Sequence, residues 1–183
     1  SRASSAESAQ LTLQLASMAF LFALGGQAQA ATRGRGEVGS RVQKARVSTR
    51  TSTTCSVLDD GTVRCWGANE SGQIGNGPVT TTQSLPAAAT GVGGVVAVAA
   101  GANHTCVLLA GGTVKCWGDN SLGQLGTGTF GGRSSTAVTV NSLDLVVAIA
   151  AGIEYTCALR AEGTARCWGR NSNFGALGNG TFN

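Results

Sequence analysis

Six cysteines and one histidine have the widest range of possible chemistry in this chain. The cysteines fall into three pairs with one spacing: Cys55 and Cys65, Cys106 and Cys116, and Cys157 and Cys167. Paired cysteines can bind zinc, supply a nucleophilic thiolate or form disulfides. Zinc ligands usually come in closer pairs such as C-x-x-C, a spacing that this sequence does not contain. Three identical pairs therefore favour three structural disulfides.

His104 is the only histidine, and it lies two residues before Cys106. A nucleophilic cysteine would need such a partner to take up its proton. The residues 51 positions before and after His104 are Thr53 and Tyr155, so no chemistry that recurs in the chain depends on an imidazole. We expect His104 to have no catalytic role.

The acidic side chains raise the possibility of sugar hydrolysis, which requires two opposed carboxylates in a cleft. They are scattered among expected turns and do not recur from one part of the chain to the next, which is typical of solvated turn residues: Asp59, Asp60, Asp119, Asp144, Glu154 and Glu162. The sequence therefore predicts no catalytic residue, no cofactor site and no metal site.

A repeat of 51 residues organises all of these positions. The same step relates the tryptophans Trp66, Trp117 and Trp168 and the asparagines Asn69, Asn120 and Asn171. Only the third unit departs from the period, because NSNFGALG has one residue more than NSLGQLG. A fixed period of this size indicates copies of one supersecondary unit side by side. We place the three units at residues 44–78, 79–129 and 130–183.

Each unit is predicted to contain an antiparallel hairpin, as in CVLLAGGTVKC (residues 106–116). The last position of its expected three-residue turn is a glycine in every copy, at Gly61, Gly112 and Gly163, which suits the positive φ of a standard hairpin loop. This register places the two cysteines of each unit opposite one another, where Cβ atoms lie about 4.5 to 5.5 Å apart. The hairpin is thus compatible with one disulfide per unit.

Two further features describe how the units pack. The runs GVVAVAAG (94–101) and LVVAIAAG (145–152) are apolar throughout, so both faces of these strands should be buried, as at the inner rim of a radial assembly. The polar KARVSTR (44–50) is their imperfect copy. Each tryptophan directly follows a cysteine, so its ring should point to the face opposite the sulfur and contact the neighbouring unit.

The N-terminal part differs from the repeats. The apolar stretch LTLQLASMAFLFALGG (11–26) leads to Ala28-Gln29-Ala30, a pattern typical of a cleaved secretory signal, and it is shorter than a membrane span. A core helix or a single membrane anchor is the alternative. We interpret residues 1–30 as a signal peptide and residues 31–43 as a linker, which predicts a secreted, periplasmic or cell-surface protein with no membrane segment after cleavage.

Composition and charge narrow the class of protein. Apolar residues make up 42% of the chain, and 28 glycines with two prolines favour an all-β fold with many tight turns. The net charge of +4 comes from the N-terminal part, since six basic and seven acidic residues follow from Cys55 onward. The repeats carry no basic stripe, so we expect no nucleic-acid partner.

The stretch VVAVAAGANHTCVLLAGGTVKCWGDNSLGQLGTG resembles the repeat of the regulator of chromosome condensation family, and the likeness covers residues 44–183. The paired cysteines resemble the secreted bacterial versions of these repeats. The resemblance implies a β-propeller of four-stranded blades, commonly seven in a ring. Three units make a partial ring, so further blades from a longer chain, or self-association, are expected to cover its open ends.

Three functions are compatible with this sequence. The first is a secreted, non-catalytic module that is stabilised by disulfides and binds a protein or cell-surface ligand through its loops, including the joining segments 78–91 and 130–144. The second, implied by the resemblance, is a guanine nucleotide exchange factor for a small GTPase, which export from the cytosol would contradict. The third is a propeller glycosidase. The first agrees best with the near-neutral repeats and the paired cysteines.

Overall fold

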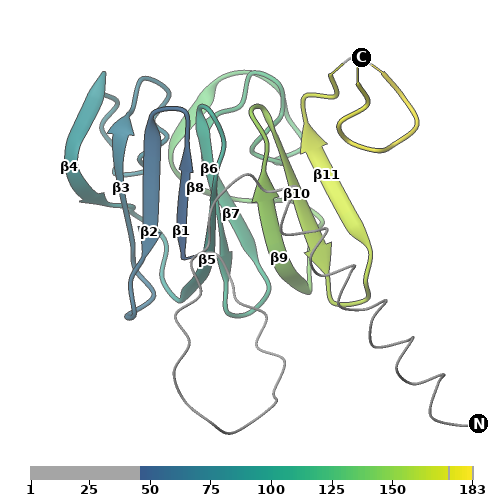
Figure 1. The fold of residues 1–183 in the computed structure, drawn as a ribbon, viewed down its shortest axis with the longest axis horizontal. Coiled ribbons are helices and arrows are strands. Elements are labelled where there is room, and N and C mark those ends of the chain that lie inside the picture. Colours follow the sequence, from purple (N-terminus) through teal and green to yellow (C-terminus); the bar gives the residue numbers. More distant parts are fainter. Residues whose placement is uncertain (1–45, 173, 183) are drawn as a thin grey trace, which may run out of the picture. The chain divides into compact units, whose positions relative to one another are not determined.

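The computed structural model describes residues 46–172 and 174–182, which lie within one compact unit, Ser40–Asn183. Eleven strands form three antiparallel sheets, and these residues include no helix (Figure 1). No segment among them could therefore cross a membrane as a helix. The predicted all-β class is confirmed. The predicted signal peptide (1–30) and linker (31–43) lie outside the described residues.

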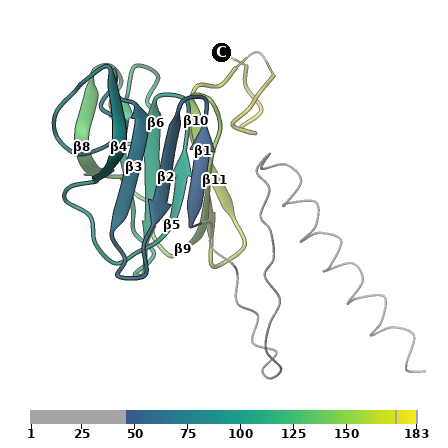
Figure 2. The same ribbon diagram turned by 60° about the vertical axis from the view of Figure 1, so that its left-hand side comes forward.

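The sheets follow one another along the chain, one sheet for each repeat. The first has the order β1-β2-β3-β4 and the second β5-β6-β7-β8, while the third contains β11-β10-β9. The strands are β1 (Val47–Arg50), β2 (Thr53–Val57), β3 (Val63–Ala68), β4 (Thr82–Ala88), β5 (Val95–Ala100), β6 (His104–Leu109), β7 (Val114–Asp119), β8 (Arg133–Thr139), β9 (Val146–Ala151), β10 (Tyr155–Arg160) and β11 (Ala165–Gly169). In Figure 2, β4 and β8 lie together at one margin, away from β1.

The first strand of each sheet lies at the inner side of the assembly. β5 contacts both β1 and β9, and the backbone N–H of Ala100 in β5 donates to Ser48 Oγ in β1 at 2.9 Å. The small side chains of β5 are almost all buried, which confirms the expected crowding. β9 has the same composition but is only half-buried beyond Val146. β1 is a shorter, more polar strand, as expected for an imperfect copy.

The segments 78–91 and 130–144 were predicted to be joining loops. Each of them also contains the outer strand of a sheet. β4 and β8 end their sheets in the strand order, so one side of each backbone has no partner among the described strands. An edge strand tolerates Pro86, whose nitrogen has no hydrogen to donate to a neighbour. Threonine and valine in these segments favour strand structure, but Pro86 in the first of them argues against it.

The hairpins have the predicted register. Val107 faces Lys115, Leu108 faces Val114, and each first cysteine lies opposite the second. The turn glycines Gly61, Gly112 and Gly163 have φ angles of 77°, 81° and 86°. The structure contains three disulfides, one in each hairpin, and every one joins Cα atoms 4.1 Å apart. That separation is typical of the narrow, non-hydrogen-bonded sites of an antiparallel ladder.

The hydrophobic core lies between the sheets and not within any one of them. One cluster combines Cys55, Cys65 and Ile74 of the first sheet with Val107 and Trp117 of the second. A second cluster repeats the arrangement one sheet further along, from Cys106 and Leu125 to Ala158 and Trp168. Each sheet therefore depends on its neighbours for the burial of its apolar side chains.

The three disulfides close loops of equal length but differ in burial. The contribution of loop closure to the free energy of unfolding can therefore be separated from the contribution of burial. Cys106 and Cys116 are fully buried, whereas Cys157 and Cys167 are half-buried. Loop closure should contribute about 3 kcal/mol to the free energy of unfolding in both cases. The double change Cys106→Ala/Cys116→Ala should cost about 1 to 2 kcal/mol more, because it also leaves a cavity. Denaturant unfolding of both double variants measures the difference, and equal losses would contradict it.

Candidate functional site

A tryptophan joins the second sheet, and another the third, to the loop of the sheet before it. Trp117 is completely buried, and its indole Nε1 donates to the backbone oxygen of Gln73 in the first sheet at 2.8 Å. Thr105, which lies opposite Trp117 in the ladder, donates to the same oxygen from its hydroxyl at 2.9 Å. The ring covers Gly75, where a Cβ would lie 2.5 Å from Nε1. Only glycine allows this approach.

The same contact recurs between the second and third sheets. Trp168 Nε1 donates to the backbone oxygen of Gln124 at 2.9 Å, and its ring lies against Gly126. In both contacts the glycine loop receives the tryptophan of the following unit. Because the repeat describes every unit alike, the sequence alone does not say whether a loop contacts the tryptophan of its own unit or that of the next.

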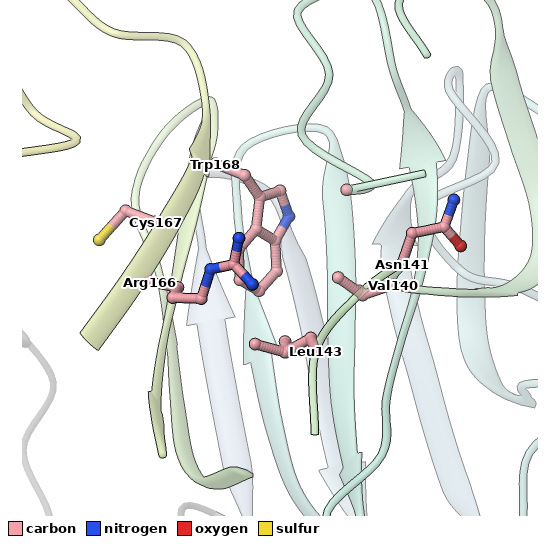
Figure 3. A pocket seen from close by; sticks show the side chains of 7 residues that line it. Val140, Asn141, Leu143, Arg166, Cys167 and Trp168 are labelled. Atoms are coloured by element: carbon pink, nitrogen blue, oxygen red, sulfur yellow. The ribbon is translucent and has the colours of Figure 1, made fainter. Parts of the chain in front are cut away.

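Figure 3 shows how Trp168 is placed. Its ring and the Arg166 side chain project from β11 toward Val140 and Leu143, whereas the sulfur of Cys167 points to the other side. This confirms that indole and sulfur occupy opposite faces of the strand. The residues line a half-open pocket of about 100 Å³ between the second and third sheets. A space of that size holds a few water molecules and is small for an organic ligand.

The asparagines that recur every 51 residues hold the loops after β3, β7 and β11 in place through side-chain hydrogen bonds. Asn69 accepts from the N–H of Ile74 at 3.1 Å and donates to the oxygen of Pro78 at 2.9 Å. Asn120 bonds Leu125 and Thr129 in the same way, and Asn171 bonds Leu177 and Thr181. One side chain thus closes each loop from within. We call these loops (residues 69–81, 120–132, and 170–172 with 174–182) the upper loops.

Each upper loop presents an apolar side chain directly after the residue that the asparagine holds. These side chains are Val79, Phe130 and Phe182, with exposed fractions of 41%, 79% and 71%. Phe174, in the same set of loops, is 92% exposed. Figure 1 shows that the loop after β11 leaves the sheet at the end to which β3 also points. The repeat therefore places exposed apolar groups along one end of the sheets.

His104 is buried beside the third sheet, with its Nε2 2.8 Å from Thr156 Oγ1. Burial lowers the pKa of His104 from 6.5 to about 4, although the nearby charges of Asp119 and Glu154 act in the opposite direction. Nδ1 has no hydrogen-bond partner among the residues that the structure describes. The neutral tautomer with its proton on Nε2 leaves an acceptor without a partner and lets Nε2–H donate to Thr156. This is a structural role for the side chain.

The acidic residues are spread over both ends of the sheets. Arg160 forms ion pairs with Asp144 and Glu162 together, and Arg170 pairs with Glu154 at 2.6 Å. Asp60 accepts from the hydroxyl and N–H of Thr62, which lowers its pKa. Within residues 46–172 and 174–182, no three acidic, histidine or cysteine side chains gather as metal ligands would.

Two kinds of residue in the sheet contacts were missed from sequence. The threonines before the first cysteines, Thr105 and Thr156, each contact the preceding sheet through a hydroxyl. The backbone oxygens of Gln73 and Gln124 accept the indole N–H. The recurrence of threonine directly before the first cysteine of a unit could have indicated that these threonines have a role. A backbone oxygen acts as an acceptor whatever the side chain, so the sequence gives no sign of it.

Comparison with known proteins identifies the repeat. Two models of the regulator of chromosome condensation (RCC1) repeat match this chain, one at residues 60–108 and 111–159 and the other at residues 95–124 and 146–175. The chain is 34% identical over 126 residues to the protein RCC2 homolog of Danio rerio, which covers 67% of this chain and 25% of that protein. It is 32% identical over 151 residues to the probable E3 ubiquitin-protein ligase HERC3 of Homo sapiens. This match covers 78% of this chain and 14% of that protein.

Solved structures show the same fold. Yeast RCC1 (Prp20), in its complex with Kap60, superposes with a TM-score of 0.67 at 21% identity and covers 76% of this chain and 35% of its own. Human WBSCR16 gives a TM-score of 0.61 at 25% identity, and the match covers 75% of this chain and 35% of WBSCR16. The chain thus spans about a quarter of the zebrafish relative and about a third of these structures. The predicted propeller fold is confirmed.

The burial of His104 predicts how stability depends on pH. Below pH 6.5 the unfolded chain takes up a proton on this residue, while the folded chain does so only near pH 4. Unfolding should therefore become easier as the pH falls from 6.5 to 4, by up to about 3 kcal/mol. His104→Gln keeps a donor for Thr156 but does not titrate, so it should lose this part of the pH slope. Denaturant unfolding from pH 4 to 8 tests this, and identical slopes would contradict it.

Proposed function

Because the chain belongs to the regulator of chromosome condensation (RCC1) repeat family, we propose that it is a non-catalytic module that binds a protein partner through its upper loops. The repeats supply a rigid scaffold, and the exposed loop residues supply the contact. Fold alone does not give function, so this proposal depends on what the loops present.

The observation that carries the proposal is the recurrence of Val79, Phe130 and Phe182 at one loop position in all three units. An isolated exposed apolar residue needs no explanation, but a set that repeats at one end of a protein is typical of an interaction surface. Aromatic residues are enriched in protein interfaces, since they bury a large area with few rotatable bonds. Phe174 adds a further exposed ring to the third loop.

The loops are also preorganised for binding. Asn69, Asn120 and Asn171 fix the backbone immediately before the exposed side chain, and the Trp117 and Trp168 rings fix the glycines within the first two loops. A loop already held in one conformation loses little entropy when a partner binds. Each loop therefore presents its exposed apolar side chain on a framework that recurs in the three units.

A protein is the favoured class of partner. From Cys55 onward the chain has six basic and seven acidic residues, several of them in ion pairs, which does not suit a polyanion. The yeast protein of similar fold, Prp20, binds Gsp1p and histones, and it also forms a complex with Kap60. Protein binding by such a scaffold supports the proposal, while the partner here is defined by an apolar surface that fits the upper loops.

The export of the protein is part of the proposal. Three disulfides in a chain of this size are expected of an oxidising compartment, and the pattern of residues 1–30 is that of a secretory signal. A partner would then be secreted or exposed at the cell surface. Nucleotide exchange on a cytosolic GTPase is the alternative.

Binding through the upper loops predicts a selective effect of two substitutions. The oxidised protein, immobilised, should retain a partner from the secreted and cell-surface fractions of its source. The double variant Phe130→Ser/Phe182→Ser should lower the affinity at least about 30-fold, because interface aromatics often contribute 2 kcal/mol or more. Binding of the purified partner can be measured by calorimetry. Leu85→Ser, at an equally exposed site in β4, is the matched control and should bind normally.

Two results would contradict binding through the upper loops. A partner held equally by the wild-type protein and by Phe130→Ser/Phe182→Ser would place the binding surface elsewhere. Accelerated release of nucleotide from a small GTPase would favour the alternative function. Both variants must first match the wild-type protein in denaturant unfolding, which is expected because surface substitutions usually change stability by less than about 0.5 kcal/mol.

Export predicts cleavage at a defined bond. With an initiating methionine added, the chain should reach the periplasm of a bacterial host and begin at Ala31, because the small-x-small pattern ends at Ala30. Mass spectrometry of the fractionated protein measures its N-terminus. Leu21→Lys places a charge in the apolar stretch and should keep the uncleaved chain in the cytoplasm. A wild-type chain that remains uncleaved in the cytoplasm would contradict export.

A further inference from the structure

The outer edge of β8, in the middle of the three sheets, has backbone groups that bond to no described strand. The N–H of Val140 donates inward to the oxygen of Val114 at 3.0 Å, and Val138, two residues earlier, is also paired with β7. Backbone groups alternate in direction along a strand, so the N–H and C=O of Ala137 and Thr139 point away from β7. Figure 2 places β8 at one margin of the sheets. The C-terminal half of β8 therefore has a free edge.

The N-terminal half of the same edge already receives a segment of the chain. The N–H of Gly77, in the upper loop of the first unit, donates to the oxygen of Ser135 at 3.1 Å. Beside it, the Arg133 guanidinium donates to the oxygen of Glu70 at 3.0 Å. Within residues 46–172 and 174–182, no backbone group outside the sheet bonds to Ala137. The edge thus accepts a backbone donor from outside its own sheet, and this contact ends before Ala137.

The equivalent edge of the first sheet is blocked by a proline. Pro86 of β4 stands 51 residues before Ala137, so the position that has an N–H in β8 has none in β4. Prolines and charged side chains are common means by which proteins prevent an edge strand from pairing with another chain. Residues 134–143 contain neither. Of the two outer strands, β8 is therefore the one whose edge is open to pairing.

We propose that two copies of this chain associate through β8, with the free backbone groups of the two strands paired antiparallel about a two-fold axis at Val138. In this register Ala137 of one copy lies opposite Thr139 of the other, and each of these pairs exchanges its N–H···O bonds as in a continuous sheet. The interface is isologous, because both copies contribute the same surface. It uses none of the exposed apolar residues of the upper loops.

A second copy fits this edge in length and in charge. β8 ends at Thr139, and Gly77 holds the edge at Ser135, so the end of one β8 reaches Ala137 of the other without displacing Gly77. Arg133 is the only charged residue of β8 and stands at its first position. Antiparallel pairing places the two Arg133 side chains at opposite ends of the contact. No like charges therefore oppose the approach of the two strands.

The test compares the oxidised full chain with two variants at one position. Ala137→Pro removes the N–H that pairing requires, and Pro86 shows that a sheet of this design accommodates proline at the equivalent position. Ala137→Ser is the matched control, because it changes the side chain and keeps the N–H. Amide hydrogen exchange in β5 to β7 should be equally slow in all three proteins, which checks that each is folded.

Sedimentation equilibrium should show a reversible association of the wild-type chain to twice its mass. Ala137→Pro should raise the dissociation constant by about tenfold or more, because each copy loses a donor and places a ring in the contact, whereas Ala137→Ser should not change it. Hydrogen exchange gives a second measurement on the wild-type chain alone. The amides of Ala137 and Thr139 should exchange more slowly as the concentration rises, while that of Val138, which is paired within the sheet, should not change.

Three results would overturn the proposal. The first is a wild-type chain that stays monomeric at every concentration; slow exchange of Ala137 and Thr139 in that monomer would mean that a segment of the same chain covers the edge. The second is association of Ala137→Pro as tight as that of the wild-type chain, which would place the contact elsewhere. The third is an equal loss in Ala137→Ser, which would show that the side chain, and not the backbone, makes the contact.

Discussion

The structure depends on the insertion of one indole ring between neighbouring sheets. Each sheet has a sulfur-bridged face and a tryptophan face, and the core forms only where two such faces meet. A ring of this size, buried in full, contributes up to about 5 kcal/mol through the removal of its apolar surface from water. The glycine beneath the ring and the backbone oxygen beside it are the conditions for that burial, which explains why the glycines recur with the tryptophans.

The surface that we assign to binding follows from the same constraint. The loop that receives the indole is held by its own asparagine and by the ring of the next sheet, and its exposed apolar residue takes part in neither contact. Residues that are free of packing can vary in sequence while their positions stay fixed. The rigid framework and the exposed Phe130 thus belong to one loop, with the contacts that recur among the units on its inner side and the exposed side chain on its outer side.

Much of this arrangement was visible in the sequence because it recurs. The period located the hairpins, the register opposed Cys106 to Cys116, and positive φ at Gly112 followed from its place in the turn. The partner of each tryptophan could not be found in this way, since a repeat describes every unit alike and does not say which neighbour a side chain contacts. The outer strands were missed because Pro86 argues against a strand and because neither TQSLPAA nor RSSTAVT has the regular apolar–polar alternation of a half-buried strand. The burial of His104 depends on Thr156, a residue of another unit, and was equally hidden.

Confinement of every disulfide to a single hairpin has a consequence for how such chains can change in length. Unequal recombination that inserts or deletes 51 codons moves both partners of a bridge together, so no half-cystine is left to pair wrongly in the new protein. The ends of the inserted unit also match whatever precedes and follows it. Chains of this design can therefore gain or lose whole units in one genetic event without leaving a cysteine unpaired.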